Sequence, residues 1–344
     1  MRDSGGDSTT GSPDIPTRRV RVAYFCMEVA FDSAAPTYSG GLGVLAGDTL
    51  HTAADIAFPM AGVTLLYRQG YFRQHLDEQG TQSEQPAVWA PEDYLEPLDA
   101  RCTVLIEGRD VHVRAWRYRF QGVTGAEVPV YFLDTDLEEN SSWDRSLTGW
   151  LYGGDVRYRL CQEVLLGIGG LAMLRALGYE QIGTYHMNEG HAALLPLALL
   201  QEELGGRDPR GASEAECASV RNRCVFTTHT PVEPGNDQFP FDLVKEVLGE
   251  THPVYLAALP YAHRSNLNMT YLALGWSRYA NAVSRRHREV SQELFPGYTI
   301  HAITNGVHAA AWTSPRFAAL YDRTAGEMAA GQFLPAGCGR DPAR

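Results

Sequence analysis

The sequence predicts an α/β protein with a doubly wound, mainly parallel, Rossmann-like sheet and a small antiparallel β extension. Apolar, β-branched segments alternate with helical patterns along most of the 344 residues. A glycine-rich turn at residues 40–43 precedes an early helix, and polar residues directly follow several of the expected strands. Apolar residues make up 44% of the chain, which is ample for a hydrophobic core.

The first part of the chain is expected to contain two buried strands, a helix and the β extension. Residues 20–27 and 61–67 are rich in β-branched and aromatic residues, as buried strands are. The helix between them begins at the glycine turn and is predicted to end near residue 58. Short alternating segments predict antiparallel strands in an edge extension or insertion at about 87–136, namely 101–107, 111–119 and 128–133.

The remainder alternates between strands and helices. A loop at 134–155 leads into a long helix from Val156 to about Leu177, which Gly178 ends. Residues 205–216 are predicted to be a polar loop. Further strands are expected at 184–187, 224–228, 279–283 and 299–303, and further helices at 191–204, 241–249, 269–276, 286–295 and 315–330.

Residues 1–19 are rich in Gly, Ser, Thr, Asp and Pro and lack an apolar stretch, so they are predicted to be a disordered lead-in and not a signal peptide. Residues 20–325 are expected to form one domain, followed by a tail at 326–344.

Composition excludes several classes of function. A net charge of −12 argues against binding to nucleic acid phosphates. No apolar run approaches the ~20 residues needed to span a bilayer, so no membrane partner is expected and a cytoplasmic location is the default. The six cysteines are scattered without a CxxC pair, which indicates neither a disulfide framework nor a zinc site. Lys245 is the one lysine, on a predicted amphipathic helix where a solvated role is expected.

The glycine turn predicts an anion site, because the first N–H groups of a helix lack partners and the helix dipole is positive there. Close packing of the helix on the sheet is the alternative explanation. Asp48 and Thr49 stand where a Walker loop needs Lys and Ser or Thr, so a nucleoside triphosphate is not expected. The stretch 41–46 fits the dinucleotide pattern GxGxxA, and Arg68 after the next strand would suit NADP.

Polar residues cluster where predicted strands end. Because the carboxyl ends of parallel strands share one edge, these residues predict a binding edge for a polyhydroxylated or anionic ligand. Two other chemistries involve residues at this edge. His186, Glu189 and His191 lack HExxH spacing, so no metal is expected, whereas Glu28 and Glu189 leave a glycosidase-like carboxylate pair open. The full set is Glu28, Arg68, His186, Asn188, Glu189, Thr228, His229, Ser284, Arg285, Asn305 and His308.

Several segments together resemble the N-terminal half of the α-glucan (glycogen, starch or maltodextrin) phosphorylases of the shorter bacterial and archaeal type. They occur in that family's order from about residue 22 to 312. The matching segments are VAYFCMEVAF (22–31), YSGGLGVLAGDTLHTAADI (38–56), GVTLLYRQGYFRQ (62–74), LYGGDVRYRLCQE (151–163), YHMNEGHAALL (185–195), VFTTHTPVEPGNDQF (225–239), MTYLAL (269–274), ANAVSRRH (280–287) and ITNGVH (303–308).

The resemblance implies a GT-B architecture and roles for matching residues. Gly40 and Gly41 would offer N–H groups to phosphate or glucose 1-phosphate, and the main-chain carbonyl of His229 would lie near the charge that develops on the transferred glucosyl unit. Substrate-binding positions would be Asp155, in a loop beside the pocket, and Arg159, Glu189, His191 and Asn305.

In this family pyridoxal phosphate is a lysine-bound acid catalyst. Its lysine and the cationic phosphate clamp belong to a second domain, which this sequence does not encode, so the chain alone is expected to be inactive. The expected partners are an α-1,4-glucan, phosphate or glucose 1-phosphate, a polypeptide carrying the C-terminal half, and a second copy in a homodimer. The expected activity is that of a retaining glucosyltransferase, in a truncated or split form. A non-catalytic glucan-binding module and an NADP-dependent enzyme are the alternatives.

Overall fold

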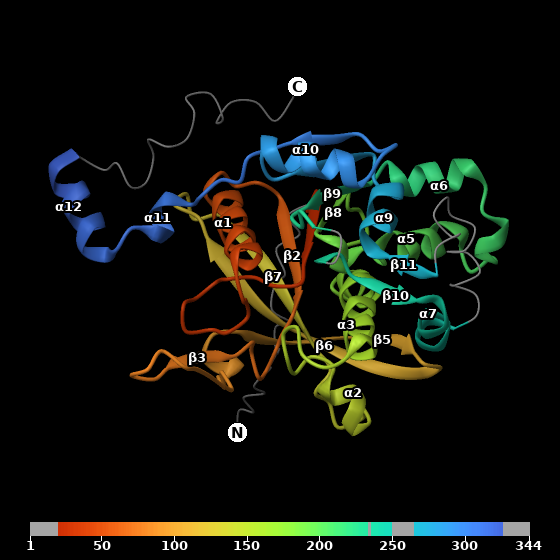
Figure 1. The fold of residues 1–344 in the computed structure, drawn as a ribbon, viewed down its shortest axis with the longest axis horizontal. Helices are drawn as coiled ribbons and strands as arrows, with labels where there is room; N and C mark the ends of the chain where they lie inside the picture. The colour runs from red at the N-terminus through yellow and green to blue at the C-terminus, as the bar shows by residue number, and fades with distance from the viewer. Residues whose placement is uncertain (1–19, 233–234, 250–264, 326–344) are drawn as a thin grey trace, which may run out of the picture.

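A computed structural model describes residues 20–232, 235–249 and 265–325. Within them nine strands form one sheet in the order β13-β12-β9-β8-β1-β2-β7-β6-β5 (Figure 1). Neighbouring strands from β13 to β7 pair in parallel, whereas β6 pairs antiparallel with both β7 and β5. The strands are β1 (Val22–Cys26), β2 (Met60–Leu65), β5 (Glu96–Ile106), β6 (Arg109–Gln121), β7 (Glu127–Asp134), β8 (Thr184–Asn188), β9 (Cys224–Thr228), β12 (Tyr279–Ala282) and β13 (Ile300–Ala302). The predicted mainly parallel sheet with an antiparallel extension is confirmed.

The central strands are buried on both faces because their side chains alternate between two hydrophobic clusters. Ala23 and Phe25 of β1 face the larger cluster, whereas Tyr24 and Cys26 face the cluster that packs against α1. The helices are α1 (Gly41–Asp55), α2 (Ser142–Ser146), α3 (Val156–Val164), α4 (Gly170–Ala176), α5 (Leu195–Leu204), α6 (Glu214–Arg221), α7 (Phe241–Leu248), α9 (Met269–Gly275), α10 (Arg285–Leu294), α11 (Ala309–Trp312) and α12 (Pro315–Ala325).

Several predicted elements need correction. The long helix from Val156 is interrupted by a π-helical turn at Leu165–Gly169, where a Cβ on Gly167 would lie 2.8 Å from the Leu195 nitrogen. The supposed loop at 205–216 includes the start of α6, which a capping box between Ser213 and Glu216 begins. Residues 134–155, predicted as loop, contain α2.

The β extension continues the main sheet at one edge, since β7 pairs directly with β2 and is followed by β6 and β5 in the strand order. A further hairpin, β3 (Arg73–Leu76) with β4 (Gln82–Gln85), was missed because all its residues are exposed and give no apolar alternation. The predicted lead-in at 1–19 and the tail at 326–344 lie outside the described residues.

The described ranges include the helix that carries Lys245 and five of the six cysteines. The helix carrying Lys245 is amphipathic as predicted, with Val244 and Val247 buried and Lys245 exposed. The cysteines in these ranges form no disulfide, and they are Cys26, Cys102, Cys161, Cys217 and Cys224. None of the described helices is long and apolar enough to cross a bilayer.

We predict that Gly47→Ala lowers the free energy of unfolding by about 1–3 kcal/mol, because α1 crosses the chain so closely that a Cβ would lie 2.0 Å from the Ala30 carbonyl oxygen. Gly41→Ala in the same helix is the matched control, since a Cβ there meets nothing within 4 Å. Urea unfolding followed by circular dichroism measures both. Equal unfolding midpoints for the two variants would contradict this account of the packing.

Candidate functional site

The exits of three neighbouring strands bring their polar residues together at the carboxyl edge of the sheet. β1, β8 and β9 are adjacent and parallel. Glu28 follows β1, Asn188 is the last residue of β8, and His229 directly follows β9. The clustering expected from the sequence is therefore present for these residues.

Glu189 ties two of these exits together. Its carboxylate accepts hydrogen bonds from the Gly190 N–H at 2.9 Å, the His229 N–H at 2.7 Å and the Thr230 hydroxyl at 3.0 Å. Its backbone has φ of 75°, a left-handed conformation that is costly for a residue with a Cβ. The carboxylate contacts offset that cost and fix the main chain at His229.

The imidazole of His229 is held in one tautomer. Asn188 donates its amide to the Cys26 sulfur at 3.2 Å, so its Oδ1 faces the His229 Nε2 at 2.7 Å and the imidazole donates. Burial lowers the pKa of His229, although the neighbouring Glu189 opposes this shift. The neutral ring is therefore protonated on Nε2, which leaves Nδ1 as an acceptor.

A second cluster surrounds Asp237. Arg159 on α3 donates to its Oδ2 at 3.0 Å, and the His191 Nε2 lies 3.3 Å from the same oxygen. Burial opposes ionisation of Asp237, but the His191 hydrogen bond and the Arg159 charge hold its pKa well below the usual range. Burial and the Asp237 charge raise the pKa of Glu163, although the Arg159 charge opposes this shift. The cluster thus places charged and polar side chains two residues along the chain from Glu189.

The glycine turn meets the sheet edge at Glu28. The Glu28 Oε2, on a side chain that is nearly fully buried, accepts the Ser39 N–H at 2.6 Å and the Gly40 N–H at 3.2 Å. Gly41 is the first residue of α1 and is exposed. Among the described residues, no acceptor for its N–H is found. The Gly40 N–H thus has an internal partner, whereas a Cβ added at Gly41 would meet nothing within 4 Å.

Tyr152 joins the Glu28 region to the Asp237 cluster. Its hydroxyl donates to the Glu28 Oε1 at 2.7 Å, and its ring lies under the Arg159 guanidinium at 4.4 Å. The ring centroid is also 5.9 Å from that of His191. One side chain therefore contacts both groups of polar residues.

Two predicted substrate residues are not part of these clusters. Asp155 is exposed and caps α3, where its carboxylate accepts the Tyr158 N–H at 2.9 Å. Asn305 is exposed beyond β13, and its N–H donates to the Val283 carbonyl at 3.1 Å. Their roles in substrate binding stay predictions.

Three other polar residues of the predicted edge have structural partners. The His186 Nε2 lies 2.8 Å from the Thr227 hydroxyl, Ser284 caps α10, and His308 lies 2.9 Å from Asp55 of α1. In the described ranges no group of three or more His, Cys, Asp or Glu side chains is placed to hold a metal ion.

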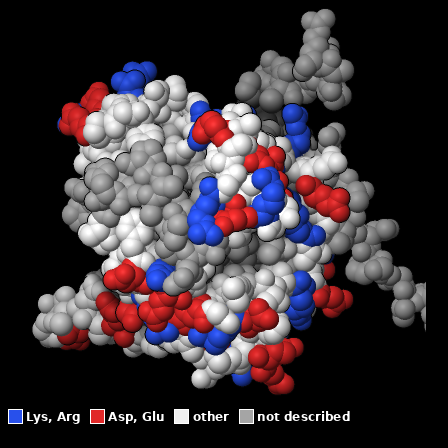
Figure 2. Space-filling model, turned by 90° about the vertical axis from the view of Figure 1, so that its right-hand side faces the viewer, with Lys and Arg blue, Asp and Glu red and all other residues white. Residues whose placement is uncertain are grey.

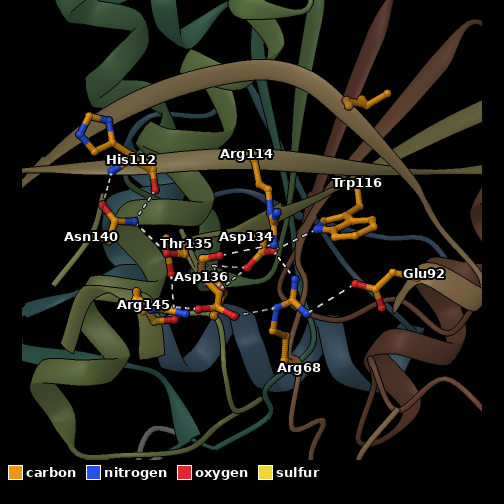
Figure 3. A network of polar contacts seen from close by, with 12 residues as sticks. Arg68, Glu92, His112, Arg114, Trp116, Asp134, Thr135, Asp136, Asn140 and Arg145 are labelled. Carbon is orange, nitrogen blue, oxygen red and sulfur yellow. Dashed lines mark hydrogen bonds and ion pairs between the residues drawn. The ribbon is translucent and has the colours of Figure 1, made fainter. Parts of the chain in front are cut away.

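Arg68 belongs to a polar network around the buried Asp134 (Figure 3). The Asp134 Oδ2 accepts hydrogen bonds from Arg68 and Arg114, each at 2.8 Å, and from the Trp116 indole at 3.0 Å. Arg68 also lies 3.5 Å from Asp136. The guanidinium that would suit NADP is thus engaged in ion pairs within the fold.

Backbone hydrogen bonds beside this network hold the loop that carries Tyr152. Directly after β2, the Arg68 N–H donates to the Thr148 carbonyl at 3.2 Å and the Gln69 N–H to the Gly149 carbonyl at 2.7 Å. The Leu151 N–H donates back to the Gly70 carbonyl at 2.9 Å. The position of Tyr152 therefore depends on the exit of β2.

Three residues of the site were not among those assigned a role from the sequence, namely Tyr152, Asn188 and Asp237. Tyr152 and Asp237 lie inside the matching segments 151–163 and 225–239, which offered a signal. Asn188 was noted as a polar residue at a strand exit, but its contact with His229 depends on the pairing of β8 with β9.

On the face shown in Figure 2 the basic and acidic side chains are interspersed, and the described residues form no continuous basic stripe there.

The chain is similar in sequence to known phosphorylases. No family model matches the chain. It is 36% identical over 349 residues to the maltodextrin phosphorylase of Thermococcus litoralis, a match that covers 94% of this chain and 40% of the relative. It is 36% identical over 350 residues to the glycogen phosphorylase of Mycobacterium tuberculosis, covering 93% of this chain and 40% of that enzyme.

The glycogen phosphorylase of Aquifex aeolicus is 30% identical over 334 residues, which cover 90% of this chain and 47% of the relative. The chain thus spans less than half the length of these three relatives. Over nearly its whole length it is similar to maltodextrin and glycogen phosphorylases, and the resemblance to the α-glucan phosphorylase family is confirmed.

Proposed function

We propose that the chain forms the N-terminal, sugar-facing part of an α-glucan phosphorylase-type retaining glucosyltransferase. Such an enzyme reversibly converts an α-1,4-glucan and inorganic phosphate to glucose 1-phosphate. One observation supports this most. Glu189, His191 and His229, which the resemblance assigns to the glucosyl pocket, lie in contiguous polar clusters at the carboxyl edge.

The geometry suits the proposed roles. The Glu189 carboxylate fixes the main chain at His229, so the carbonyl of that residue can be held near positive charge that develops on a glucosyl carbon. Side chains such as His191 and Asp237 provide donors and acceptors for sugar hydroxyls. Gly41 is the first residue of α1, so its N–H lies at the positive end of the helix dipole. That end of a helix favours phosphate.

The paired-carboxylate alternative is less well supported. Glu28 and Glu189 each accept at least three hydrogen bonds from protein donors, including two from backbone N–H groups. A glycosidase needs one carboxyl group free to protonate the leaving group and another free to attack or to activate water. These two side chains are engaged in holding the backbone instead.

We infer that pyridoxal phosphate, if the enzyme uses it, is attached outside this chain. Lys245, the one lysine of the sequence, is exposed on α7 and does not fit an attachment site at the sheet edge. When bound, the cofactor supplies a phosphate group that exchanges a proton with the substrate phosphate. We place its lysine on a polypeptide that carries the second GT-B domain.

The surface after β13 suits contact with such a domain. We take residues 20–325 to be one GT-B N-terminal domain. Helix α12 lies apart from the sheet (Figure 1), and large apolar side chains are exposed along this part of the chain. They are Ile303, Val307, Trp312, Phe317, Leu320 and Tyr321.

Glu189→Gln is expected to weaken maltoheptaose binding by about 10- to 100-fold, because a hydrogen bond to a charged group is worth about 1.5–3 kcal/mol. The amide would lose charge and one acceptor where His229 and Thr230 now donate. Glu202→Gln is the control, since Glu202 pairs with Arg175 on the surface. Isothermal titration calorimetry measures both, and equal affinity in the two variants would place the glucan elsewhere.

The chain alone is expected neither to absorb as a pyridoxal aldimine nor to release glucose 1-phosphate from glycogen. Co-expression with the C-terminal part of the Thermococcus litoralis relative should yield release that requires phosphate. A coupled assay for glucose 1-phosphate measures this activity. Phosphorolysis by the pure 344-residue chain would overturn the proposed division of the site.

Binding measurements separate the alternatives. Maltoheptaose binding without phosphorolysis in any co-expressed complex would favour a non-catalytic glucan-binding module. Binding of NADPH at micromolar affinity, followed by nicotinamide fluorescence, would favour the dinucleotide alternative. The ion pairs of Arg68 with Asp134 and Asp136 argue against that last outcome.

A further inference from the structure

The Glu28 carboxylate contacts the glycine turn from inside the protein. Its Oε2 accepts the N–H groups of Ser39 and Gly40, although only 2% of the residue is exposed. A buried carboxylate is costly unless donors surround it, and backbone N–H groups at a helix start are suitable donors. The turn and Glu28 thus stabilise one another before any external anion binds.

The glycine spacing fits this internal contact. A Cβ on Gly43 would lie 2.9 Å from the Glu28 Oε2 and 2.5 Å from the Cβ of Tyr38. At Gly40 and Gly41, by contrast, a Cβ would meet nothing within 4 Å. Gly43 is therefore needed for the close approach of Glu28, whereas the two exposed glycines leave space outside the turn.

The backbone around Glu28 is held from both sides. The Tyr67 hydroxyl donates to the Met27 carbonyl at 2.6 Å, and the Ala30 N–H donates to the Gly43 carbonyl at 2.9 Å. A rigid support of this kind is what a positioning residue requires. Because the backbone on both sides of Glu28 is hydrogen-bonded, its carboxylate can hold the glycine turn in position.

The remaining carboxylate oxygen leads to the sugar-facing cluster. The Glu28 Oε1 accepts the Tyr152 hydroxyl at 2.7 Å, and the Tyr152 ring contacts Arg159 and His191. Arg159 and His191 both contact Asp237. A single hydroxyl hydrogen bond therefore connects the glycine turn with the Asp237 cluster.

We propose that Glu28 is a positioning residue that fixes the glycine turn and, through Tyr152, couples it to the sugar-facing cluster. Phosphate binding at Gly41 and glucan binding near Asp237 then influence each other. The inference rests on the proposed function, because that function supplies the two ligands. It adds a physical link between the two halves of the binding site.

Tyr152→Phe tests the link with little other change, because phenylalanine keeps the ring below Arg159 and removes only the hydroxyl. Tyr179→Phe is the matched control, since it removes a hydroxyl that lies 2.6 Å from the Tyr131 hydroxyl, in contacts separate from this site. Inorganic phosphate is titrated into the isotope-labelled full chain, with and without maltoheptaose, and the Gly41 amide is followed by NMR.

In the wild type and the control, maltoheptaose should change the apparent phosphate affinity by about fivefold or more. In Tyr152→Phe this change should fall to less than about twofold. Tyr152→Phe with the coupling of the wild type would overturn the proposal. The melting temperatures of the two variants separate the loss of coupling from a general loss of stability.

Amide hydrogen exchange tests the positioning role without any ligand. Glu28→Gln should accelerate exchange at Ser39 and Gly40 by about tenfold or more, and Glu28→Asp should restore part of the protection. Unchanged exchange at both amides would overturn the role of Glu28. If the wild type binds neither ligand while these rates respond as expected, the proposed function of the isolated chain fails and the positioning role stands.

Discussion

Backbone N–H groups that donate to buried carboxylates hold the candidate site together. Glu189 binds the His229 N–H across two strand exits, and Glu28 binds the N–H groups of Ser39 and Gly40. Both carboxylates are nearly fully buried, so their charges depend on these donors. Together with the Ala30 N–H bond to the Gly43 carbonyl, they fix the exits of β1, β8 and β9 relative to the glycine turn.

This constraint explains why the polar residues of the edge divide into two kinds. Residues such as Glu28 and Glu189 have their acceptors filled by the protein and shape the site. The Nδ1 of His229 and the N–H of Gly41 are left for a ligand by the contacts found in the described residues. A sugar phosphate offers hydroxyls to the first and an anion to the second, which is the combination that the proposed reaction requires.

The sequence predicted the sheet and the clustering of polar residues at its carboxyl edge because both follow from local patterns. Alternating strands and helices imply parallel pairing, and polar residues after strands imply a shared edge. It could not predict that Glu28 would bind Gly40, since that contact depends on how a loop of about ten residues folds back. The helix at Glu214–Arg221 was missed because polar residues surround its capping box. The pairing of β7 with β2 also required tertiary contacts that no local pattern contains.

The central claim is that a glucan binds at the edge formed by Glu189, His191 and His229. Hydrogen exchange of the full chain, followed by mass spectrometry with and without maltoheptaose, tests it most directly. The account predicts slower exchange in peptides covering 185–195 and 225–232, with little change in β5 and β6. Protection confined to the groove between α1 and residues 306–307, or to the hollow beside Arg114 and Arg145, would contradict it.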